Sequence, residues 1–574
     1  MNYAALARFS RWSAIVWIVV FWRLGYASLL DPDEAHYAEL TREMLHAHSW
    51  LVPLLDGRAY IDKPVLFHWL QGLAVALTGE SEFAVRLPSA VAALGLFAFV
   101  RWVGTRLFNV ETGEAGALML ATIPATFALS SVGLVDMVYT LFLFGGVGCL
   151  LVAAFAAAPY AQWCGFGLLA LAVMTKGPIA LVLVALFFGL SAAISRESRT
   201  ALVSLDWSRG CALMAAVALP WFGWMWRQFG DQFVSKYLLA GNVWYFTGPA
   251  WFPVKAANHM FYVRVFTAAF FPWSFLVLGS VADAWANTRV RAQISVAAMQ
   301  LWIWLFVVVG FFSVACFKLD HYIFPAAPAC CLIAARAWIR AGIDESWHWT
   351  RRAVIAIAGS FVVLGVAGAI ALTRIDLGLT SAAFALPFVL VSGGTVMRWQ
   401  LRGRRWVPRR LMSVPLATLL LTYTGLVALG LPVLERSRPG SSVGRWIAKH
   451  VQPGEPVALY RLERFRASTR YYAGRPIGAL DDLSSLREFL EVGGQKYVVM
   501  LRSDFDEARS AGVPIIDVFA RSIVVRTSGK GFRRQHWGHI VIATRAEGDI
   551  GPDSIHVKGA GSDAEKRREL TPPG

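Results

Sequence analysis

The sequence has few charged residues for its length, since Asp, Glu, Lys and Arg make up 16% of 574 residues. A soluble domain usually carries about 25%. Hydrophobic residues reach 57%, and the mean hydropathy is +0.52. The apolar residues stand in long blocks rather than at scattered positions. This composition excludes a soluble enzyme, a disordered chain and a fibrous repeat, and it predicts a polytopic α-helical membrane protein.

Cysteine is also scarce, and its placement indicates neither a disulfide framework nor a metal site. All six cysteines lie in apolar stretches without metal-ligand spacing: Cys149, Cys164, Cys211, Cys316, Cys330 and Cys331. The chain contains no HExxH pair and no internal repeat.

Positive charge is in excess, with 54 Lys and Arg against 37 Asp and Glu, and 44 of the 54 are Arg. Such a surplus can attract nucleic acid. Here most of the arginines stand in short loops between apolar blocks, and many of the 24 tryptophans lie at block ends. The membrane and its interfacial aromatic belt explain both features better, so we expect no nucleic-acid partner.

A spanning helix needs about 20 apolar residues. Thirteen segments are predicted to span: 12–30, 85–103, 114–132, 137–158, 161–176, 178–195, 209–226, 259–281, 296–316, 320–338, 353–372, 378–397 and 411–431. The segments 161–176 and 178–195 can instead form one bent span. The first segment lacks a clean signal-peptide cleavage site and is interpreted as an anchor.

The arginines predict the orientation, because cytoplasmic loops are enriched in Lys and Arg. A cytoplasmic N-terminus places the following on the inside: Arg101, Arg106, Arg196, Arg199, Arg209, Arg289, Arg291, Arg336, Arg340, Arg351, Arg352, Arg398, Arg402, Arg404, Arg405, Arg409 and Arg410. With thirteen spans the C-terminal tail then lies outside.

Composition divides the chain into a transmembrane domain (1–434), a small outer α/β domain (435–546) and a disordered tail (547–574). In the second domain, strands are predicted at 456–462, 496–502, 515–526 and 539–544, and helices at 442–451, 465–473 and 484–491.

The loop 31–84 is long and rich in structure signals. Asp31 is suited to cap a helix whose first residue is Pro32, with Asp33 and Glu34 in its first turn. A second, apolar helix is predicted after Lys63-Pro64, at the membrane surface. On the first helix one face carries Asp33, His36, Tyr37 and Leu40.

Each of these residues also has a purely structural interpretation. Asp33 and Glu34 can simply cap the helix, and Lys63 can be an interfacial anchor. For three histidines we prefer a satisfied or solvated imidazole: His46, His48 and His68.

Further ionisable residues fall at the predicted outer ends of spans: Arg86, Asp136, Lys176, Lys318, Asp320 and His321. One such residue has a simple explanation, but together they gather at one side of the membrane. A proton-coupled transporter is expected to carry its charges near mid-bilayer. The pattern therefore favours an enzyme acting on a lipid headgroup.

Seven motifs, in order, carry a family resemblance: DPDEAHYAELTREML, IDKPVLFHWLQ, EFAVRLPSA, GLVDMVYT, MTKGP, FFPWSF and KLDHYIFPAAP. They resemble the bacterial aminoarabinose-transferase-like glycosyltransferases, membrane enzymes of the GT-C type related to the protein O-mannosyltransferases. The resemblance covers roughly residues 10–340. It implies a polyprenyl-phosphate sugar as donor and transfer on the periplasmic side of the bacterial inner membrane. The implied acceptor is lipid A, another envelope glycan or lipid, or a protein.

The resemblance also assigns roles to residues. The carboxylate of the Asp33-Glu34 pair is the catalytic one, with Asp33 in that position. The residues expected to hold the donor's phosphate and sugar are Lys63, Tyr60, His36, Tyr37, Asp136, Arg86, Lys176, Lys318, His321, Tyr322 and Tyr245. Two positions depart from the family pattern, because His36 and Tyr245 stand where the family tends to have Arg.

In chemical terms, Asp33 is the expected general base for the acceptor hydroxyl. Lys63 and Lys318 are expected to stabilise the departing lipid phosphate, in a direct displacement that inverts the anomeric centre. No metal is expected to be obligatory, although Asp62 or Asp136 can hold a divalent cation. The competing hypotheses are a protein O-glycosyltransferase and a transporter of lipid-linked sugars.

Overall fold

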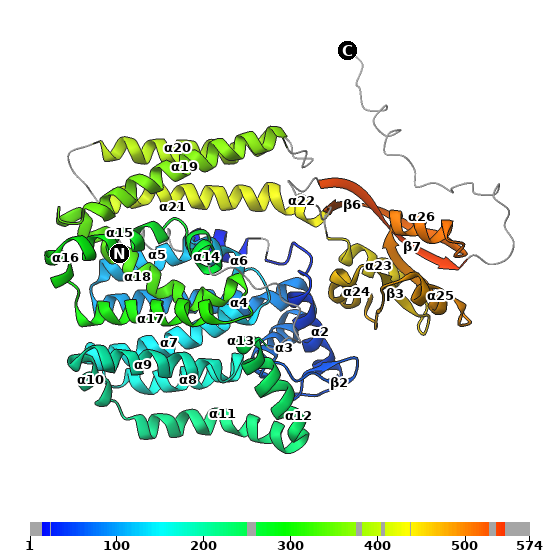
Figure 1. Cartoon of the computed structure of the whole chain (residues 1–574), viewed down its shortest axis with the longest axis horizontal. Helices are drawn as coiled ribbons and strands as arrows, with labels where there is room; N and C mark the ends of the chain where they lie inside the picture. Colours follow the sequence, from blue (N-terminus) through cyan, green and yellow to red (C-terminus); the bar gives the residue numbers. More distant parts are fainter. Residues whose placement is uncertain are drawn as a thin grey trace, which may run out of the picture. The chain divides into compact units, whose positions relative to one another are not determined.

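The computed structural model describes residues 14–22, 24–248, 260–374, 381–402, 408–436, 438–526 and 535–545. The chain divides into two compact units, Met1–Ser441 and Ser442–Gly574. Helices dominate the described part of the first unit, and the second contains a mixed sheet with helices (Figure 1). The division falls inside one helix, a few residues after the boundary expected from composition at 434.

The first unit contains, in chain order, these elements. They are η1 (Trp17–Phe21), α2 (Asp33–His46), β1 (Leu54–Leu55), β2 (Arg58–Ala59), α3 (Leu66–Thr78), α4 (Glu82–Leu107), α5 (Val110–Thr122), α6 (Pro124–Leu129), α7 (Val135–Phe155), α8 (Ala161–Lys176), α9 (Ile179–Ile194), α10 (Arg196–Val203), α11 (Trp207–Phe229), α12 (Asp231–Phe233), η2 (Val234–Trp244), α13 (Tyr245–Thr247), α14 (Phe261–Ala269), α15 (Ser274–Ala286), α16 (Thr288–Ala292), α17 (Val296–Val314), η3 (Asp320–Ala326), α18 (Ala327–Ile343), α19 (His348–Arg374), η4 (Ser381–Phe384), α20 (Ala385–Leu401), α21 (Pro408–Gly425), η5 (Leu426–Gly430) and α22 (Leu431–Arg436).

Long apolar helices confirm the prediction of a polytopic α-helical membrane protein. Within the described ranges, seven helices are long and apolar enough to cross a membrane, or up to nine if two bent helix pairs each count as one span. The bent pairs are α10 with α11, at 61°, and α14 with α15, at 113°. The count of thirteen stays a prediction. The expected span 114–132 is interrupted at Pro124, which begins α6 because proline cannot donate to the preceding turn. Pro178 is the N-cap of α9, so the expected spans 161–176 and 178–195 correspond to the separate helices α8 and α9.

One apolar core joins the helices of the first unit. α7 packs against α4 and α8, while α18 packs against α5. Two fully buried tryptophans tie elements together through their indole N–H groups. Trp273 donates to Thr122 Oγ1 at 3.1 Å, and Trp304 donates to the Pro325 carbonyl at 2.8 Å. The indoles thus bury a large apolar surface without leaving their polar atoms unpaired.

The start of α2 differs from the sequence-based expectation. Pro32 occupies the cap position, the helix begins at Asp33, and no cap side chain accepts a bond from the first turn. Asp31 is therefore not the capping residue, and Pro32 is not the first helical one. Instead Glu34 reaches back, and its Oε2 accepts a hydrogen bond from the Leu30 N–H at 2.8 Å.

The second unit contains α23 (Gly440–His450), β3 (Val457–Tyr460), η6 (Glu463–Phe465), α24 (Arg466–Ala473), β4 (Gly478–Leu480), α25 (Leu483–Glu491), β5 (Tyr497–Leu501), α26 (Arg502–Ser510), β6 (Ile515–Arg526) and β7 (Gln535–Arg545). The strand order is β4-β3-β5-β7-β6. The first three strands are parallel, and β7 runs antiparallel to both β5 and β6.

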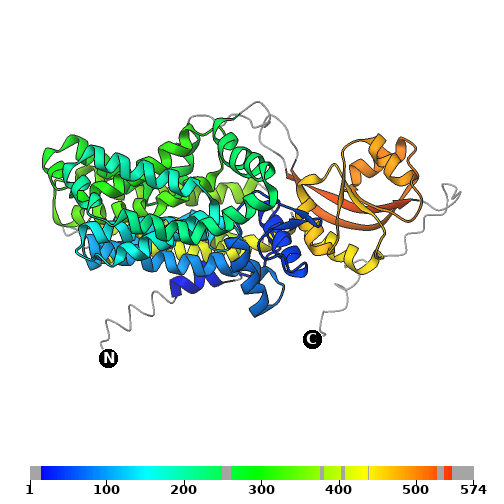
Figure 2. The same ribbon diagram turned by 90° about the horizontal axis from the view of Figure 1, so that it is seen from below.

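Helices cover both faces of this sheet (Figure 2). One apolar cluster joins α23 and α24 to the sheet, and another joins α25 and α26. The sequence did not predict the short strand β4. The expected disordered tail, 547–574, lies outside the described residues.

Candidate active site

The loop between η1 and α4 folds into α2 and α3, which pack together. A short antiparallel β1–β2 pair lies between them. Asp33 and Glu34 both occupy the first turn of α2, where the helix dipole favours carboxylates. Asp33 is exposed, whereas Glu34 is buried. The two adjacent acids therefore sit in different surroundings.

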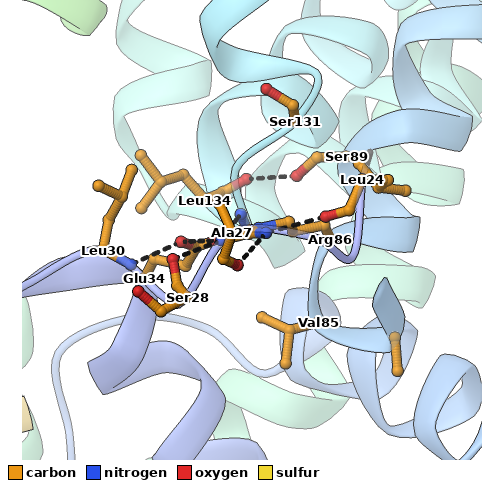
Figure 3. A network of polar contacts seen from close by, with 12 residues as sticks. Leu24, Ala27, Ser28, Leu30, Glu34, Val85, Arg86, Ser89, Ser131 and Leu134 are labelled. Carbon is orange, nitrogen blue, oxygen red and sulfur yellow. Dashed lines mark hydrogen bonds and ion pairs between the residues drawn. The ribbon is translucent and has the colours of Figure 1, made fainter. Parts of the chain in front are cut away.

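Glu34 forms a buried ion pair with Arg86 of α4 (Figure 3). Arg86 Nε donates to Oε1 at 2.7 Å, and its Nη2 donates to Oε2 at 3.0 Å. The Gly133 N–H donates a third hydrogen bond to this carboxylate, at 2.7 Å from Oε1. With the bond from Leu30, each oxygen of Glu34 accepts two hydrogen bonds.

Arg86 also donates hydrogen bonds to three backbone carbonyls. Its Nη1 donates to the carbonyls of Leu24 and Ala27, both at 2.8 Å, and its Nη2 donates to that of Ser28, at 3.0 Å. The ion pair thus fixes the chain between η1 and α2 to α4 and to the entrance of α7. These contacts favour a structural role for Glu34 and Arg86 rather than the catalytic and phosphate-binding roles expected from sequence.

Asp136, Lys176 and His321 meet from three separate elements. Lys176 Nζ, at the end of α8, lies 2.6 Å from Asp136 Oδ1 in the first turn of α7. His321 Nε2 of η3 lies 3.7 Å from the other oxygen. The Lys176 ammonium also lies 4.7 Å from the ring centroid of Tyr322. Charges this deeply buried persist where they are paired, so this group is a fixed electrostatic centre.

Tyr37 of α2 is influenced both by Asp136 of this group and by carboxylates of the loop 31–84. Burial raises the pKa of Tyr37 well above its ordinary value, and the charges of Asp62, Asp136 and Asp33 raise it further. Two carboxylates of the loop 31–84 and one from the start of α7 thus raise the pKa of one phenol. Lys63 lies 3.1 Å from Asp62 Oδ2 and within electrostatic range of Asp136.

His36 and Tyr60 line the same part of the loop. Their rings meet edge to face, with centroids 4.8 Å apart. The aromatic contact holds the segment before Asp62-Lys63 against α2. The structure therefore brings together most of the residues expected to hold the donor: His36, Tyr37, Tyr60, Lys63, Asp136, Lys176, His321 and Tyr322.

Of the three other expected residues, Arg86 is paired with Glu34 instead. Lys318 Nζ donates to the Ala315 carbonyl at 2.5 Å, just after the end of α17, and it forms no ion pair with a described carboxylate. The backbone of Tyr245 belongs to α13, but its side chain lies outside the described part of the structure.

Tyr237 is a site residue that the sequence did not predict. It belongs to η2, a π-helix, a form that often marks functional sites. Its hydroxyl is buried without a hydrogen-bond partner among the described residues. It abuts Gly177, directly after Lys176: a β-carbon at Gly177 would lie 2.1 Å from that oxygen. Burial and the charge of Asp62 raise the pKa of Tyr237. In the sequence Tyr237 stands in a mixed segment, VSKYLLAGNVW, which gives no clear signal for a site.

The carboxylates considered for a cation are already matched by positive side chains. Asp62 pairs with Lys63, and Asp136 pairs with Lys176. In the described ranges no group of three or more His, Cys, Asp or Glu residues could hold a metal ion. A divalent cation at Asp62 or Asp136 stays a prediction.

The fold and this site define a polytopic helical membrane protein in which the carboxylate-rich loop 31–84 meets the ends of several helices. The structure is similar to the crystal structure of ArnT from Cupriavidus metallidurans bound to undecaprenyl phosphate, with a TM-score of 0.73 and 18% identity over 96% of this chain and 100% of that chain. The apo form of that protein gives a TM-score of 0.70 at 19% identity, over 94% and 98% of the two chains. These matches establish the fold.

Sequence comparisons agree with this fold. The family model of the dolichyl-phosphate-mannose-protein mannosyltransferases matches residues 62–224. An undecaprenyl phosphate-α-4-amino-4-deoxy-L-arabinose arabinosyl transferase from Proteus mirabilis is 25% identical over 384 residues, 63% of this chain and 64% of the relative. One from Enterobacter is 29% identical over 339 residues, 55% of this chain and 56% of the relative. The chain thus matches less than two thirds of the length of these relatives, and it is similar to the ArnT-like GT-C glycosyltransferases.

Proposed function

We propose that the chain is an integral-membrane glycosyltransferase. It moves a sugar from undecaprenyl phosphate, or a similar polyprenyl phosphate, to lipid A or another lipid or glycan of the cell envelope. The relatives carry the name of this reaction, and the ArnT structure with the same fold binds undecaprenyl phosphate. The lipid bilayer supplies the donor laterally.

The observation that carries the proposal is the group of charges around Tyr37. Asp33, Asp62 and Asp136 all act on its hydroxyl, and ammonium groups stand beside two of these acids. A transfer from a lipid phosphate needs both kinds of group: a base for the acceptor, and cations for the leaving phosphate. The arrangement supplies both within one site.

In the proposed mechanism Asp33 is the general base. It is exposed at the start of α2, so an acceptor hydroxyl can reach it. As Asp33 takes the proton, the acceptor oxygen attacks the anomeric carbon, and the bond from that carbon to the phosphate oxygen breaks. The electron pair stays on the lipid phosphate, and the anomeric configuration inverts.

Lys63 is the cation proposed to stabilise that phosphate. Its side chain is about a fifth exposed and its ammonium pairs with Asp62, so the ammonium can exchange that carboxylate for a phosphate oxygen of the donor. Lys176 is held by Asp136, and we assign it to positioning that carboxylate and the rings beside it. The Tyr237 hydroxyl, buried beside Gly177, is proposed as a further donor that meets its partner when substrate is bound.

The identity of the sugar is less constrained. His36 and Tyr245 stand where the resembling family tends to have arginine, so the proposed donor class is a polyprenyl-phosphate sugar without commitment to aminoarabinose. The match of residues 62–224 to the mannosyltransferase model supports one alternative, transfer to Ser or Thr of a protein. Mass spectrometry of lipids and proteins from cells with and without the gene separates the two acceptors.

The proposed orientation follows the arginine distribution. The outer loop, the ends of the spans that carry the site, and the second unit lie in the periplasm of a bacterium with the protein in its inner membrane. We propose that the second unit covers the site or docks the acceptor. Deleting 442–574 is then expected to change acceptor choice while leaving donor binding intact.

Asp33→Asn tests the mechanism directly. With a defined undecaprenyl-phosphate sugar and a lipid A acceptor, transfer by the purified variant is expected to fall about 10²- to 10⁴-fold, the usual contribution of a general base. Asp231→Asn is a matched control, because it removes an exposed carboxylate from the first turn of α12 in the same unit. Near-normal transfer by Asp33→Asn would show that Asp33 is not the base.

A further inference from the structure

A cavity lies in the first unit, between α15, α16, α17 and α18. Its volume is about 460 Å³, within the range of small-molecule sites. Most of its wall is apolar, with Val281, Leu301, Trp302 and Ile333 among the lining residues. Two arginines, Arg291 and Arg336, also line it.

The cavity is remote from the candidate active site. It lies where α17 begins and α18 approaches its end, whereas His321 precedes the start of α18. Arg336 and His321 are separated by roughly 20 Å along the helix, at 1.5 Å per residue. Figure 1 likewise places α16 at one end of the helical bundle and α2 at the other. The donor site and this cavity are therefore different sites.

Neither arginine is neutralised by a carboxylate of the described residues. Arg336 donates to the Gln293 carbonyl at 2.6 Å and contacts Ser295 Oγ at 3.5 Å. Arg291 donates to the carbonyls of Ala284 and Trp285, both at 3.0 Å. A guanidinium has five N–H donors, so both side chains retain donors and a full positive charge for a ligand.

Two further polar atoms of the lining residues are buried without a partner among the described residues. They are Oε1 of Gln293 and Nε1 of Trp347. A buried polar atom without a partner costs about 1–3 kcal/mol. Such atoms are found where a water or a ligand completes the bonding. The Trp347 N–H can donate to an anionic headgroup, whereas Gln293 Oε1 can accept from a hydroxyl or a water.

We propose that this cavity binds an anionic phospholipid. The phosphate lies between Arg291 and Arg336, and an acyl chain enters the apolar part near Val281, Leu301 and Trp302. Unpaired cations beside an apolar cavity at the ends of membrane spans complement an anionic amphiphile. In the orientation proposed above, the lipid comes from the cytoplasmic leaflet.

The test uses native mass spectrometry of the full chain with phosphatidylglycerol and phosphatidylcholine supplied together. The wild type is expected to retain phosphatidylglycerol with roughly a thirtyfold preference, the size expected when two basic groups face an anionic headgroup. The double variant Arg291→Gln/Arg336→Gln is expected to lose this preference.

Two further variants make the result specific. Ala284→Phe fills the cavity without removing a hydrogen-bonding side chain, and it is expected to lose the bound lipid even if the arginines prove necessary for folding. Arg340→Gln is the matched control, because it removes a charge one turn further along α18 from a residue that does not line the cavity. It is expected to keep the preference.

Three outcomes would overturn the proposal. They are retention of the preference by Ala284→Phe or by the double variant, an equal loss in Arg340→Gln, and displacement of the lipid by inorganic phosphate alone. The last would show that the arginines bind a free anion instead of a lipid.

Discussion

Replacing Arg86 with methionine would leave the Glu34 carboxylate buried without its cation. The two side chains are 3% and 0% exposed, so solvent provides little compensation. Removing one partner of a buried ion pair typically costs about 3–5 kcal/mol of stability. Arg86 also satisfies the carbonyls of Leu24, Ala27 and Ser28, so the cost is expected at the upper end of that range.

Glu34→Gln is the informative partner of this variant, because it keeps the size of the side chain and one acceptor oxygen. It should destabilise less than Arg86→Met, since Arg86 retains its three carbonyl partners. The double variant should be more stable than the sum of the two changes predicts, because no unpaired charge remains.

The assay is denaturant unfolding of detergent-solubilised protein, followed by tryptophan fluorescence and paired with a transfer assay. Asp33→Asn, one residue away but exposed, should unfold like the wild type. If Glu34→Gln unfolds like the wild type and yet loses transfer as completely as Asp33→Asn, then Glu34 takes part in the chemistry and its structural assignment is wrong.

Three further changes test other parts of the site. Lys63→Ala should raise KM for the donor at least about tenfold, whereas Lys236→Ala, an exposed control, should not; equal KM values would remove Lys63 from the phosphate site. Tyr237→Phe should leave the free energy of unfolding without substrate unchanged or higher, because it removes a buried hydroxyl that lacks a described partner, while kcat falls. Unchanged kcat would mean that this hydroxyl does not meet the substrate. Burial lowers the pKa of His68 from 6.5 to about 3, so below pH 6.5 the unfolded chain binds a proton that folded His68 does not. Stability should therefore fall as the pH drops, by about 1.4 kcal/mol at pH 5.5. His68→Gln should remove this part of the pH dependence of unfolding, and an unchanged slope between pH 7.5 and 5.5 would contradict the assignment.

Local sequence was sufficient to predict several features. Long apolar runs predicted the membrane helices, because each run can satisfy its backbone within one helix. The Lys63-Pro64 step predicted the start of α3 to within a few residues. His68 was also expected to be a satisfied imidazole, and it lies buried 2.8 Å from Thr41 Oγ1.

The different surroundings of Asp33, which is exposed, and Glu34, which is buried, could not be predicted from local sequence. Both residues suit the first turn of a helix, and the dipole favours either carboxylate there. Their difference arises because Arg86, 52 residues further along the chain, lies against only one of them. Likewise Gly133 can donate to Glu34 only because it approaches closely: a β-carbon there would lie 2.7 Å from Val85 Cγ1.

The sequence by itself determined the class of protein, the two helices of the loop 31–84 and a set of ionisable residues at predicted ends of spans. The tertiary structure decided which of them meet: Asp136 with Lys176 rather than Lys318, Tyr237 with Gly177, and Glu34 with Arg86. Helix periodicity governs neighbours three or four residues apart, so it can place a side chain on a face. Pairing between helices depends on how whole helices pack in space, and only the folded chain contains that information.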